Sequence, residues 1–518
     1  MYLQDCQEII DLKNEIVEFC SMHSEIWIYG AGKYGKCMLK ILKNEKINCN
    51  GFVVTHVKEF LIGNITVIQA STMKKAKKKI GIIPAFRRAK EKAIRMEVGA
   101  EVDVFPLYSD RLETFIYYYS IKNCMMLLQS RKMSILPPIK EWRNILVIRL
   151  DVLGDLVMTT AFIRELRKNC PMGHITFIVH KSMESIYFNC PYISELLTYD
   201  ESILSVLDEC NSFSKLNISA IQYVKRNLEN RIYDVVFLPC DVFNGRNSIM
   251  TMLLAYHSGA KALMGRVNAL TSRGRSIYAL VQLLFSSISY ETHGRHEVEY
   301  MLDLLKICGG SIKNNKTELW IRQVDREKAM YRFPYLNNKY IVAIGVVGST
   351  RNKNWMPSKY IETIQNIQRY YIENINFIII GGKDAVNSGK QITTSISDDY
   401  IHDLTGKTNL TEVVAIMEKC CLYIGADTGL MHVAAALNIP VVELSTSIKG
   451  SDASDGAVPE RMGPWGVKFI ALEADRGLDG CERICTAPYS HCINQITVDE
   501  VVDATKKFLE KIVVRKDS

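Results

Sequence analysis

The chain has 518 residues, of which 48% are hydrophobic and 23% charged, and its formal net charge is +8. This composition is ordinary for a globular protein and excludes collagen, a coiled coil or general disorder as the main architecture. The excess of 64 Lys and Arg over 56 Asp and Glu is modest for this length. It permits a phosphate-bearing ligand or an anionic membrane surface but demands neither. At about 100–200 residues per domain, we expect about three domains.

Two features of the sequence bear on the cellular compartment. The opening segment MYLQDCQEIIDLKNE is acidic and has no apolar run, which is unlike a secretory signal. No apolar stretch reaches the ~20 residues that a membrane-spanning helix needs. We therefore expect a cytoplasmic protein that contacts the inner membrane at most peripherally. Most of the fifteen cysteines are then expected to be buried thiols and not disulfides.

The first α/β unit contains a short apolar strand, the glycine-rich turn GAGKYG, a helical run and a second strand. This order makes a βαβ unit, and Gly30, Gly32 and Gly35 match the dinucleotide fingerprint. A full fingerprint has an acidic residue at the end of the second strand, where this sequence has Thr55 or His56. We therefore favour a Rossmann-like domain without a dinucleotide, or with another nucleotide ligand, over an NAD site.

Residues 111–133 are predicted to form a connecting helix, and Pro137 and Pro138 then mark a linker. The second unit starts at the strand NILVIRL, a near-continuous apolar run typical of a parallel sheet that is covered on both faces. An amphipathic helix is predicted from about Leu156.

The segment DVLGD is therefore expected to form the turn between this strand and this helix, with Asp151, Gly154 and Asp155 at the carboxyl edge of the sheet. A carboxylate placed there can accept a proton from an incoming hydroxyl, as a general base does. The alternative is that Asp155 only caps the helix.

The third unit starts at KYIVAIGVVGS and again alternates strands with helices, which predicts a parallel sheet. Directly after its first strand come Ser349, Thr350 and Lys353. Hydroxyls and a cation after a strand suit a phosphate group. The alternative is a solvated turn.

The segment YIGADTGLMH is the most informative in the chain. A strand is followed by Asp427 and Thr428 at the start of a predicted helix, and the helix carries Gly429 and His432. The free N–H groups and the positive end of a helix make an anion site, and glycine lets a ligand come close. The alternative is that Asp427 is an N-cap and His432 a hydrogen-bonded core histidine.

Two other clusters have a simpler interpretation. Cys481, Cys485 and Cys492, with His491, lack the paired C-x-x-C spacing of a zinc ribbon, so we predict buried thiols and no metal site. The basic stretch 74–95 has no aromatic residue other than Phe86 and no nucleic-acid-binding fold motif, so we expect a solvated helix face and no nucleic acid.

Residues from about 144 to 510 resemble glycosyltransferase family 9, the ADP-heptose lipopolysaccharide heptosyltransferases and their relatives. The resemblance is carried, in family order, by ILVIRLDVLGDLVMTTAFIRELRKN, HEVEYMLDLLKICGG, GSTRNKNW, DLTGKTNL and GADTGLMHVAAALNIPVVELST. It implies an α/β protein of GT-B type, with two Rossmann-like halves that face a cleft, in addition to the N-terminal Rossmann-like α/β domain. The expected domains are residues 1–140 (N-terminal domain), 141–330 (acceptor half), 331–480 (donor half) and 481–518 (cysteine-containing tail and final helix).

The resemblance also implies roles for individual residues. Asp155 matches the general base of the family, and Lys353 matches the lysine that neutralises the donor diphosphate. The other matches all fall in donor-binding segments: Ser349, Thr350, Asp384, Asp427, Thr428, Gly429 and His432. Since Lys353 and a helix end can stabilise the leaving diphosphate, no metal is required for the transfer.

The implied reaction is an inverting transfer of heptose or another sugar from a nucleotide sugar, with an ADP-sugar as the first expectation. The implied acceptor is lipid-linked or a polysaccharide, in the assembly of lipopolysaccharide or capsule. The loop GVVGSTRNKNW and the long segment LSTSIKGSDASDGAVPERMGPWG depart from the family pattern and are expected to shape the choice of donor. Two other functions stay open: an NAD-dependent or sugar-nucleotide-modifying enzyme that acts through Gly30, Gly32 and Gly35, and a non-catalytic nucleotide-sugar-binding protein.

Overall fold

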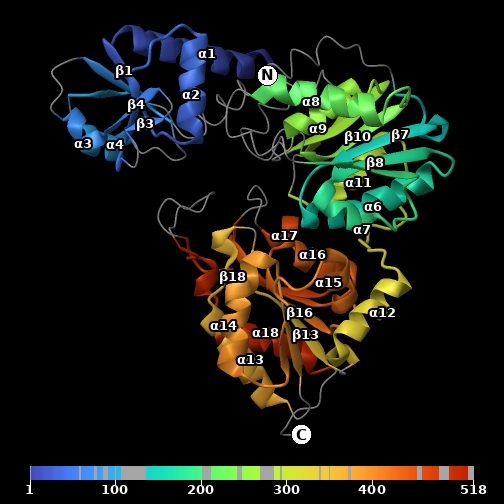
Figure 1. Ribbon diagram of the computed structural model, residues 1–518. Coiled ribbons are helices and arrows are strands. Elements are labelled where there is room, and N and C mark those ends of the chain that lie inside the picture. The colour runs from blue at the N-terminus through green and yellow to red at the C-terminus, as the bar shows by residue number, and fades with distance from the viewer. Residues whose placement is uncertain are drawn as a thin grey trace.

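The computed structural model forms three six-stranded sheets, which succeed one another along the chain (Figure 1). The structure describes residues 2–57, 60–62, 64–74, 79–85, 91–99, 101–106, 136–200, 212–241, 248–268, 285–291, 294–337, 340–348, 350–371, 375–451, 458–477 and 489–511. The helix predicted at 111–133 lies outside these residues. The α/β class that the sequence predicts is confirmed.

The N-terminal sheet has the strand order β3-β4-β2-β1-β5-β6, in which β3 pairs antiparallel with β4 and the other pairs are parallel. Its strands are β1 (Glu25–Tyr29), β2 (Gly51–Val54), β3 (Leu61–Ile62), β4 (Ile65–Gln69), β5 (Ile80–Pro84) and β6 (Asp103–Val104). Its helices are α1 (Tyr2–Ser21), α2 (Lys33–Asn44), α3 (Ala70–Met73) and α4 (Glu91–Val98).

The three glycines between β1 and α2 have different structural roles. Gly30 has a φ of +105°, a conformation that L side chains rarely adopt. A Cβ on Gly35 would lie 1.8 Å from the carbonyl oxygen of Gly30, so Gly35 lets the helix pack closely on the turn. A Cβ on Gly32 would meet nothing within 4 Å. Two of the glycines are thus required by the fold, while Gly32 borders open space.

The middle unit, which runs from β7 to α11, has an all-parallel sheet with the order β12-β11-β10-β7-β8-β9. Its strands are β7 (Asn144–Arg149), β8 (His174–His180), β9 (Glu195–Tyr199), β10 (Val235–Asp241), β11 (Ala262–Asn268) and β12 (Ser287–Glu291). Its helices are α6 (Leu153–Asn169), α7 (Glu184–Tyr187), α8 (Ser212–Asn227), α9 (Ser248–His257) and α11 (Glu297–Ile307), with short 3-10 turns η1 (Ile139–Glu141) and η2 (Lys181–Met183). Helix α6 buries Leu156 and Phe162 in the same apolar core as Val147 of β7.

The C-terminal unit, which runs from α12 to α18, has an all-parallel sheet with the order β15-β14-β13-β16-β17-β18. Its strands are β13 (Ile341–Gly345), β14 (Asn376–Ile380), β15 (Ile401–Asp403), β16 (Leu422–Ala426), β17 (Val441–Ile448) and β18 (Phe469–Ala474). Its helices are α12 (Gln323–Arg332), α13 (Pro357–Tyr370), α14 (Val386–Ile396), α15 (Leu410–Met417), α16 (Gly429–Ala436), α17 (Pro459–Met462) and α18 (Val498–Leu509), with 3-10 turns η5 (Pro334–Asn337), η6 (Arg351–Lys353), η7 (Lys383–Ala385) and η8 (Ile493–Gln495).

Two helices of the C-terminal unit lie near the expected domain boundaries. Helix α12 packs on α15 through the Arg326–Glu418 and Arg332–Glu412 ion pairs. Helix α18 packs on α13, and Trp355 donates a hydrogen bond to the main chain of Ile496. We therefore propose that the C-terminal unit begins before α12 and that the tail helix is part of it.

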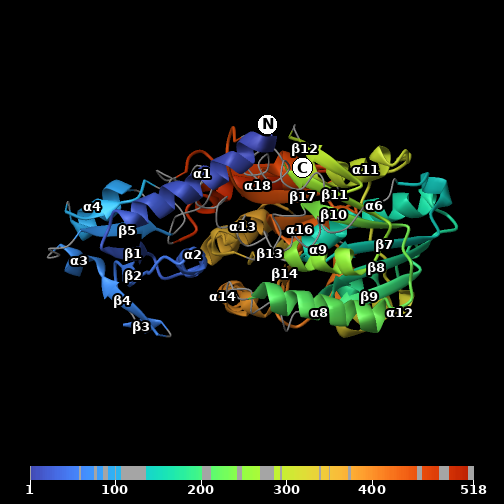
Figure 2. The same cartoon turned by 90° about the horizontal axis from the view of Figure 1, so that it is seen from above.

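The middle and C-terminal units meet where α16 packs on α6 (Figure 1). Figure 2 shows the molecule from above, with the N-terminal unit at one end. A Cβ on Gly154 would lie 2.6 Å from Cδ2 of His432, and a Cβ on Gly429 would lie 2.7 Å from Cβ of Leu153. The first turns of the two helices can approach this closely because each has a glycine at the contact.

Two expectations about the cysteines and the membrane can be compared with the structure. Nine cysteines among the described residues are free thiols, as expected for most of them, whereas Cys37 is disulfide-bonded. In the described part of the chain, no helix has both the length and the apolar composition to cross a membrane.

The different roles of Gly35 and Gly32 lead to a first prediction. Gly35→Ala should destabilise the N-terminal unit by about 3 kcal/mol, because its methyl group would overlap the main chain of Gly30. Gly32→Ala is the matched control and should leave the stability almost unchanged. Hydrogen–deuterium exchange of β1 and α2 during urea unfolding measures both variants. Equal exchange in the two variants would contradict this packing.

Candidate active site

The candidate residues of the middle and C-terminal units lie at corresponding points of the two sheets. In the middle sheet β7 lies between β8 and β10, and in the C-terminal sheet β13 lies between β14 and β16. The chain connections reverse direction at these strands, and ligands of open parallel sheets bind beyond the carboxyl ends of the strands at such points. Asp155 follows β7, whereas Lys353 follows β13 and Asp427 follows β16.

Asp155 lies in the first turn of α6. The helix begins at Leu153, three residues before the predicted start, so Gly154 and Asp155 are helical and do not lie in a preceding turn. The N-cap is Val152, which makes no side-chain cap, and Oδ1 of Asp155 instead accepts a hydrogen bond from Nη2 of Arg149 at 2.9 Å. The capping interpretation of Asp155 was therefore wrong. Its side chain is 26% exposed and remains open to a ligand.

Arg149, the last residue of β7, holds this carboxylate in place. Its side chain is 4% exposed, its Nε lies 3.1 Å from Oδ2 of Asp151, and its Nη1 donates to the main-chain oxygen of Pro239 on β10. Burial by itself would lower the pKa of Arg149, but the charges of Asp155 and Asp151 raise it. Burial, with the nearby charge of Asp155, raises the pKa of Asp151 to about 6, although Arg149 opposes this.

Lys353, Asp427 and His432 form a second cluster, in the C-terminal unit. Nζ of Lys353 donates to Oδ2 of Asp427 at 2.6 Å and to its main-chain oxygen at 2.7 Å. Nε2 of His432 lies 3.6 Å from Oδ1 of the same carboxylate. Burial would raise the pKa of Asp427, but the His432 hydrogen bond and the charge of Lys353 lower it to about 2. Asp427 is therefore ionised at neutral pH.

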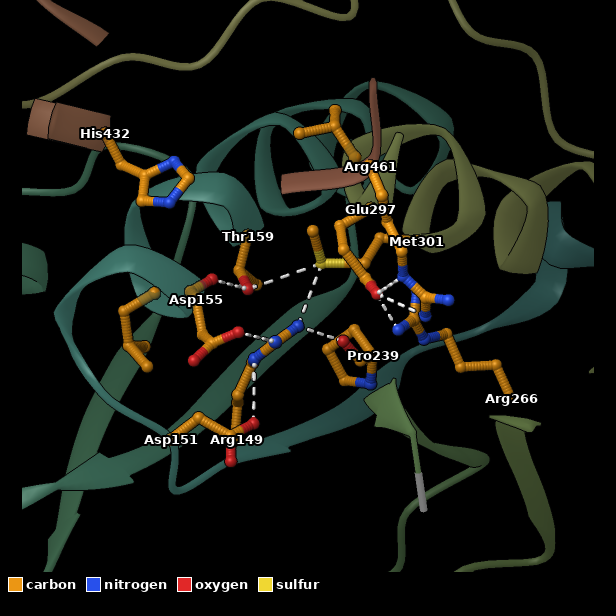
Figure 3. Close-up of polar contacts among 12 residues, drawn as sticks. Arg149, Asp151, Asp155, Thr159, Pro239, Arg266, Glu297, Met301, His432 and Arg461 are labelled. Carbon is orange, nitrogen blue, oxygen red and sulfur yellow. Dashed lines mark hydrogen bonds and ion pairs between the residues drawn. The ribbon is translucent and has the colours of Figure 1, made fainter. Parts of the chain in front are cut away.

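The N-cap of α16 is Thr428, which makes no side-chain cap, so the interpretation of Asp427 as N-cap was also wrong. His432 is 3% exposed, and its Nδ1 has no hydrogen-bond partner among the described residues. Figure 3 shows its ring next to the first turn of α6, which carries Asp155. Because His432 packs on Gly154, the base candidate of one unit and the charged cluster of the other lie at the same junction.

Glu443 on β17 is a residue that the sequence analysis missed. It is 1% exposed, and neither carboxyl oxygen has a partner among the described residues. Burial and the charge of Asp427 raise the pKa of Glu443 well above its usual range. The carboxylate that Lys353 contacts is that of Asp427. The sequence could have pointed to Glu443, because it is the one acidic residue in the apolar strand PVVELS.

The remaining predicted site residues of the C-terminal unit are more dispersed. Thr350 is exposed, and its main-chain oxygen accepts from the N–H of Lys353 at 3.0 Å. Asp384 is exposed on η7, beyond the carboxyl end of β14. Ser349 lies outside the described residues, as do Cys481 and Cys485.

Of the four residues considered as metal ligands, the structure describes His491 and Cys492. Sγ of Cys492 lies 3.7 Å from Nδ1 of His491. Within the part of the chain that the structure describes, no group of three or more His, Cys, Asp or Glu is arranged to hold a metal ion.

In the N-terminal unit, Gly30, Gly32 and Gly35 lie between β1 and α2, as the fingerprint predicts. No acidic residue of β2 lies where the fingerprint has one, but a carboxylate from α4 lies at this place. Oγ1 of Thr55 donates to Oε2 of Glu97 on α4 at 2.9 Å, and the Tyr29 hydroxyl donates to the same carboxylate. The spacing rule could not find Glu97, because α4 reaches this edge only in the folded sheet.

Comparison with known proteins gives related results by sequence and by structure. Residues 224–476 match the family described as glycosyltransferase family 9 (heptosyltransferase). The chain is 21% identical over 302 residues to the lipopolysaccharide core heptosyltransferase OpsX of Haemophilus influenzae, which covers 58% of this chain and 78% of that protein. It is 23% identical over 294 residues to lipopolysaccharide heptosyltransferase 3 of Escherichia coli, which covers 56% and 79% of the two chains.

Two solved structures share the fold of the middle and C-terminal units. The glycosyltransferase family 9 protein from Veillonella parvula superimposes with a TM-score of 0.57 at 20% identity, over 74% of this chain and all of that one. The ADP-heptose lipopolysaccharide heptosyltransferase II of E. coli gives a TM-score of 0.50 at 18% identity, over 71% and 99%. The GT-B architecture expected from the resemblance is confirmed. Residues 224–476 therefore resemble glycosyltransferase family 9, and the protein is heptosyltransferase-like in this segment and in the fold of its middle and C-terminal units.

Proposed function

We propose that this protein transfers a sugar from a nucleotide diphosphate donor to a hydroxyl group of a lipopolysaccharide-type, lipid-linked acceptor, with inversion at the anomeric carbon. The proposal rests above all on the packing of Gly154 against His432, which puts the helix turn that carries Asp155 against one member of the Lys353–Asp427–His432 cluster. The names of the related lipopolysaccharide heptosyltransferases support this acceptor class. The ADP bound in the structure of E. coli heptosyltransferase WaaC supports an adenine nucleotide in the donor.

The proposed reaction uses one group from each unit. The acceptor oxygen attacks the anomeric carbon while Asp155 takes the proton of that hydroxyl. The bond between the anomeric carbon and the diphosphate breaks, and the nucleoside diphosphate leaves with the electron pair. Lys353 and the N–H groups that begin α16 stabilise the negative charge of the leaving group, so no metal is needed for this step.

Lys353 already has a partner in this structure. Its ammonium donates to the side chain and to the main-chain oxygen of Asp427. We propose that the diphosphate becomes an additional partner of Lys353 and that Thr350, Thr428 and Gly429 line the phosphate path. Ser349 belongs to the same proposed loop, and Asp384 is proposed to lie near the nucleoside, since it follows β14 at the same edge. The proposed sugar is heptose or another sugar of lipopolysaccharide or capsule.

The acceptor class also bears on location. Because the proposed acceptor is lipid-linked, we propose a cytoplasmic enzyme that works in peripheral contact with the inner membrane.

A second candidate function concerns the N-terminal unit, where Gly32 faces open space and Glu97 stands at the end of β2. This arrangement favours a bound nucleotide, with Glu97 in the place of the ribose-binding acid of a dinucleotide site. Fluorescence titration with NADH and with ADP tests it: wild type should bind one of them, and Gly32→Ala should weaken that binding. Absence of binding by both nucleotides would remove this candidate and the NAD-dependent alternative with it.

Asp155→Asn gives the most direct prediction for the transfer reaction. The amide keeps the shape of the side chain but cannot accept the proton, so kcat should fall by about 10²- to 10⁴-fold. The donor Kd should stay within about twofold, because Asp155 is not proposed to touch the diphosphate. Transfer of radiolabelled sugar and equilibrium binding measure the two quantities. The control is Asp325→Asn on α12, whose carboxylate pairs with Arg322.

Unchanged turnover in Asp155→Asn would remove Asp155 as the base. Donor binding without any transfer by wild type, across all acceptors tried, would instead support a non-catalytic nucleotide-sugar-binding protein.

Lys353→Met tests the donor side. A thermal-shift screen of ADP-, GDP-, UDP- and CDP-sugars should find one class that stabilises wild type, since a ligand that binds only the folded state raises Tm. The same donor should no longer stabilise Lys353→Met. Lys306→Met, which removes an exposed lysine at the far end of α11, is the control and should keep the shift. A full shift in Lys353→Met would contradict the proposed diphosphate site.

A further inference from the structure

A second contact joins the middle and C-terminal units, at the start of α11. Arg461 on α17 reaches Glu297, the first residue of α11, with Nη2 at 2.8 Å and Nε at 3.1 Å from Oε1. Arg266 on β11 pairs with the other oxygen of the same carboxylate. All three side chains are less than a tenth exposed. Glu297 is thus shared between one arginine of its own unit and one arginine of the other (Figure 3).

The residue before Glu297 makes the same connection. Nδ1 of His296 accepts a hydrogen bond from the N–H of Val298, so Nε2 carries the proton and donates to the main-chain oxygen of Gly463 at 2.9 Å. The His296 ring also stacks on Trp465, with 4.4 Å between ring centroids. Residues 461–465 therefore hold the start of α11 by an ion pair, a hydrogen bond and a ring contact.

Helix α11 connects this contact to the base. Met301 lies one turn after Glu297 and so on the same face of α11. Its Sδ lies 2.9 Å from Nη1 of Arg149 and 3.5 Å from Oγ1 of Thr159. Thr159 donates to the main-chain oxygen of Asp155, and Arg149 donates to the Asp155 carboxylate. The same face of α11 therefore contacts Arg461 through Glu297, and contacts Arg149 and Thr159 through Met301.

The described ion pairs of this network include charged groups from both units. The middle unit supplies three carboxylates (Asp151, Asp155 and Glu297) and two guanidinium groups (Arg149 and Arg266). Arg461 supplies the third guanidinium group, from the C-terminal unit. Burial would raise the pKa of Glu297, but Arg266 and Arg461 lower it to about 2, so Glu297 is ionised. Loss of one partner from a buried ion network is strongly destabilising, because it leaves a charge uncompensated.

We propose that Arg461 is a positioning residue for the general base: its contact with Glu297 fixes α11, and α11 holds Arg149 and Thr159 against Asp155. This inference rests on the proposed role of Asp155, and it adds that the base is held in its working position only while the two units are in contact. The acceptor half and the donor half are thereby linked through side chains that touch neither substrate.

The test compares Arg461→Gln with Arg461→Lys and with the control Arg332→Gln, which removes a half-exposed arginine of α12. Hydrogen–deuterium exchange reads the structural part without any need for activity. Residues 150–158 and 296–302 should exchange faster in Arg461→Gln than in wild type, while β13 and β14 should be unchanged. In Arg461→Lys the increase should be smaller, because position 461 still supplies a cation to Glu297.

Kinetics read the functional part. In Arg461→Gln, kcat should fall by about 10- to 100-fold, since a small misplacement of a catalytic group has an effect of this size. The donor Kd should not change. In an Asp155→Asn background the same substitution should cause no further loss, because two residues that act through one group are not additive.

These readouts separate the possible failures. Unchanged exchange at residues 150–158 in Arg461→Gln would overturn the inference, whatever the activity of the protein. Full additivity of the two substitutions would overturn it as well, since Arg461 would then act independently of Asp155. Wild type that transfers no sugar would refute the proposed function, while the exchange data would still decide whether Arg461 orders the turn that carries Asp155.

Discussion

Two helix N-termini meet at Gly154 and Gly429, and the arrangement of the candidate site depends on this contact. His432 of α16 packs on Gly154 of α6, and Leu153 of α6 packs on Gly429 of α16. A side chain at either glycine would push the helices apart. The contact packs the first turn of α6, which carries Asp155, against His432, whose ring also lies near the carboxylate of Asp427.

Around this contact, buried charges are paired within and between the units. Lys353 balances Asp427. Arg149 balances Asp155 and Asp151, and Glu297 joins Arg266 to Arg461 of the other unit. Because unpaired charges are costly to bury, each pair limits how its neighbours can move. A donor diphosphate that binds Lys353 therefore enters a site in which the other charged groups named above already have partners.

The sequence allowed prediction of the elements and of the main residues that follow the strands. Asp155, Lys353, Asp427 and His432 could be selected because functional side chains of parallel sheets gather at the carboxyl ends of strands. The start of α6 was predicted too late, since Val152 is an apolar N-cap and Gly154 is typical of a turn. The capping interpretations of Asp155 and Asp427 failed because each carboxylate has a cationic partner that is distant in sequence or on another element.

The residues that the sequence analysis missed owe their roles to tertiary contacts. Arg149 and Glu443 could have been noticed, because each is a charged residue in an otherwise apolar strand. In the structure, Arg149 pairs with the half-buried carboxylates of Asp151 and Asp155. Glu297 and Arg461 are 164 residues apart, and no local pattern pairs them.

The most direct measurement is a crystal structure of the protein with its nucleotide diphosphate and an acceptor analogue. The diphosphate should lie within hydrogen-bonding distance of Nζ of Lys353, and the acceptor hydroxyl should lie about 3 Å from the carboxylate of Asp155. A diphosphate bound elsewhere, or an acceptor hydroxyl on the far side of the sugar from Asp155, would contradict a shared site at the junction of the two units.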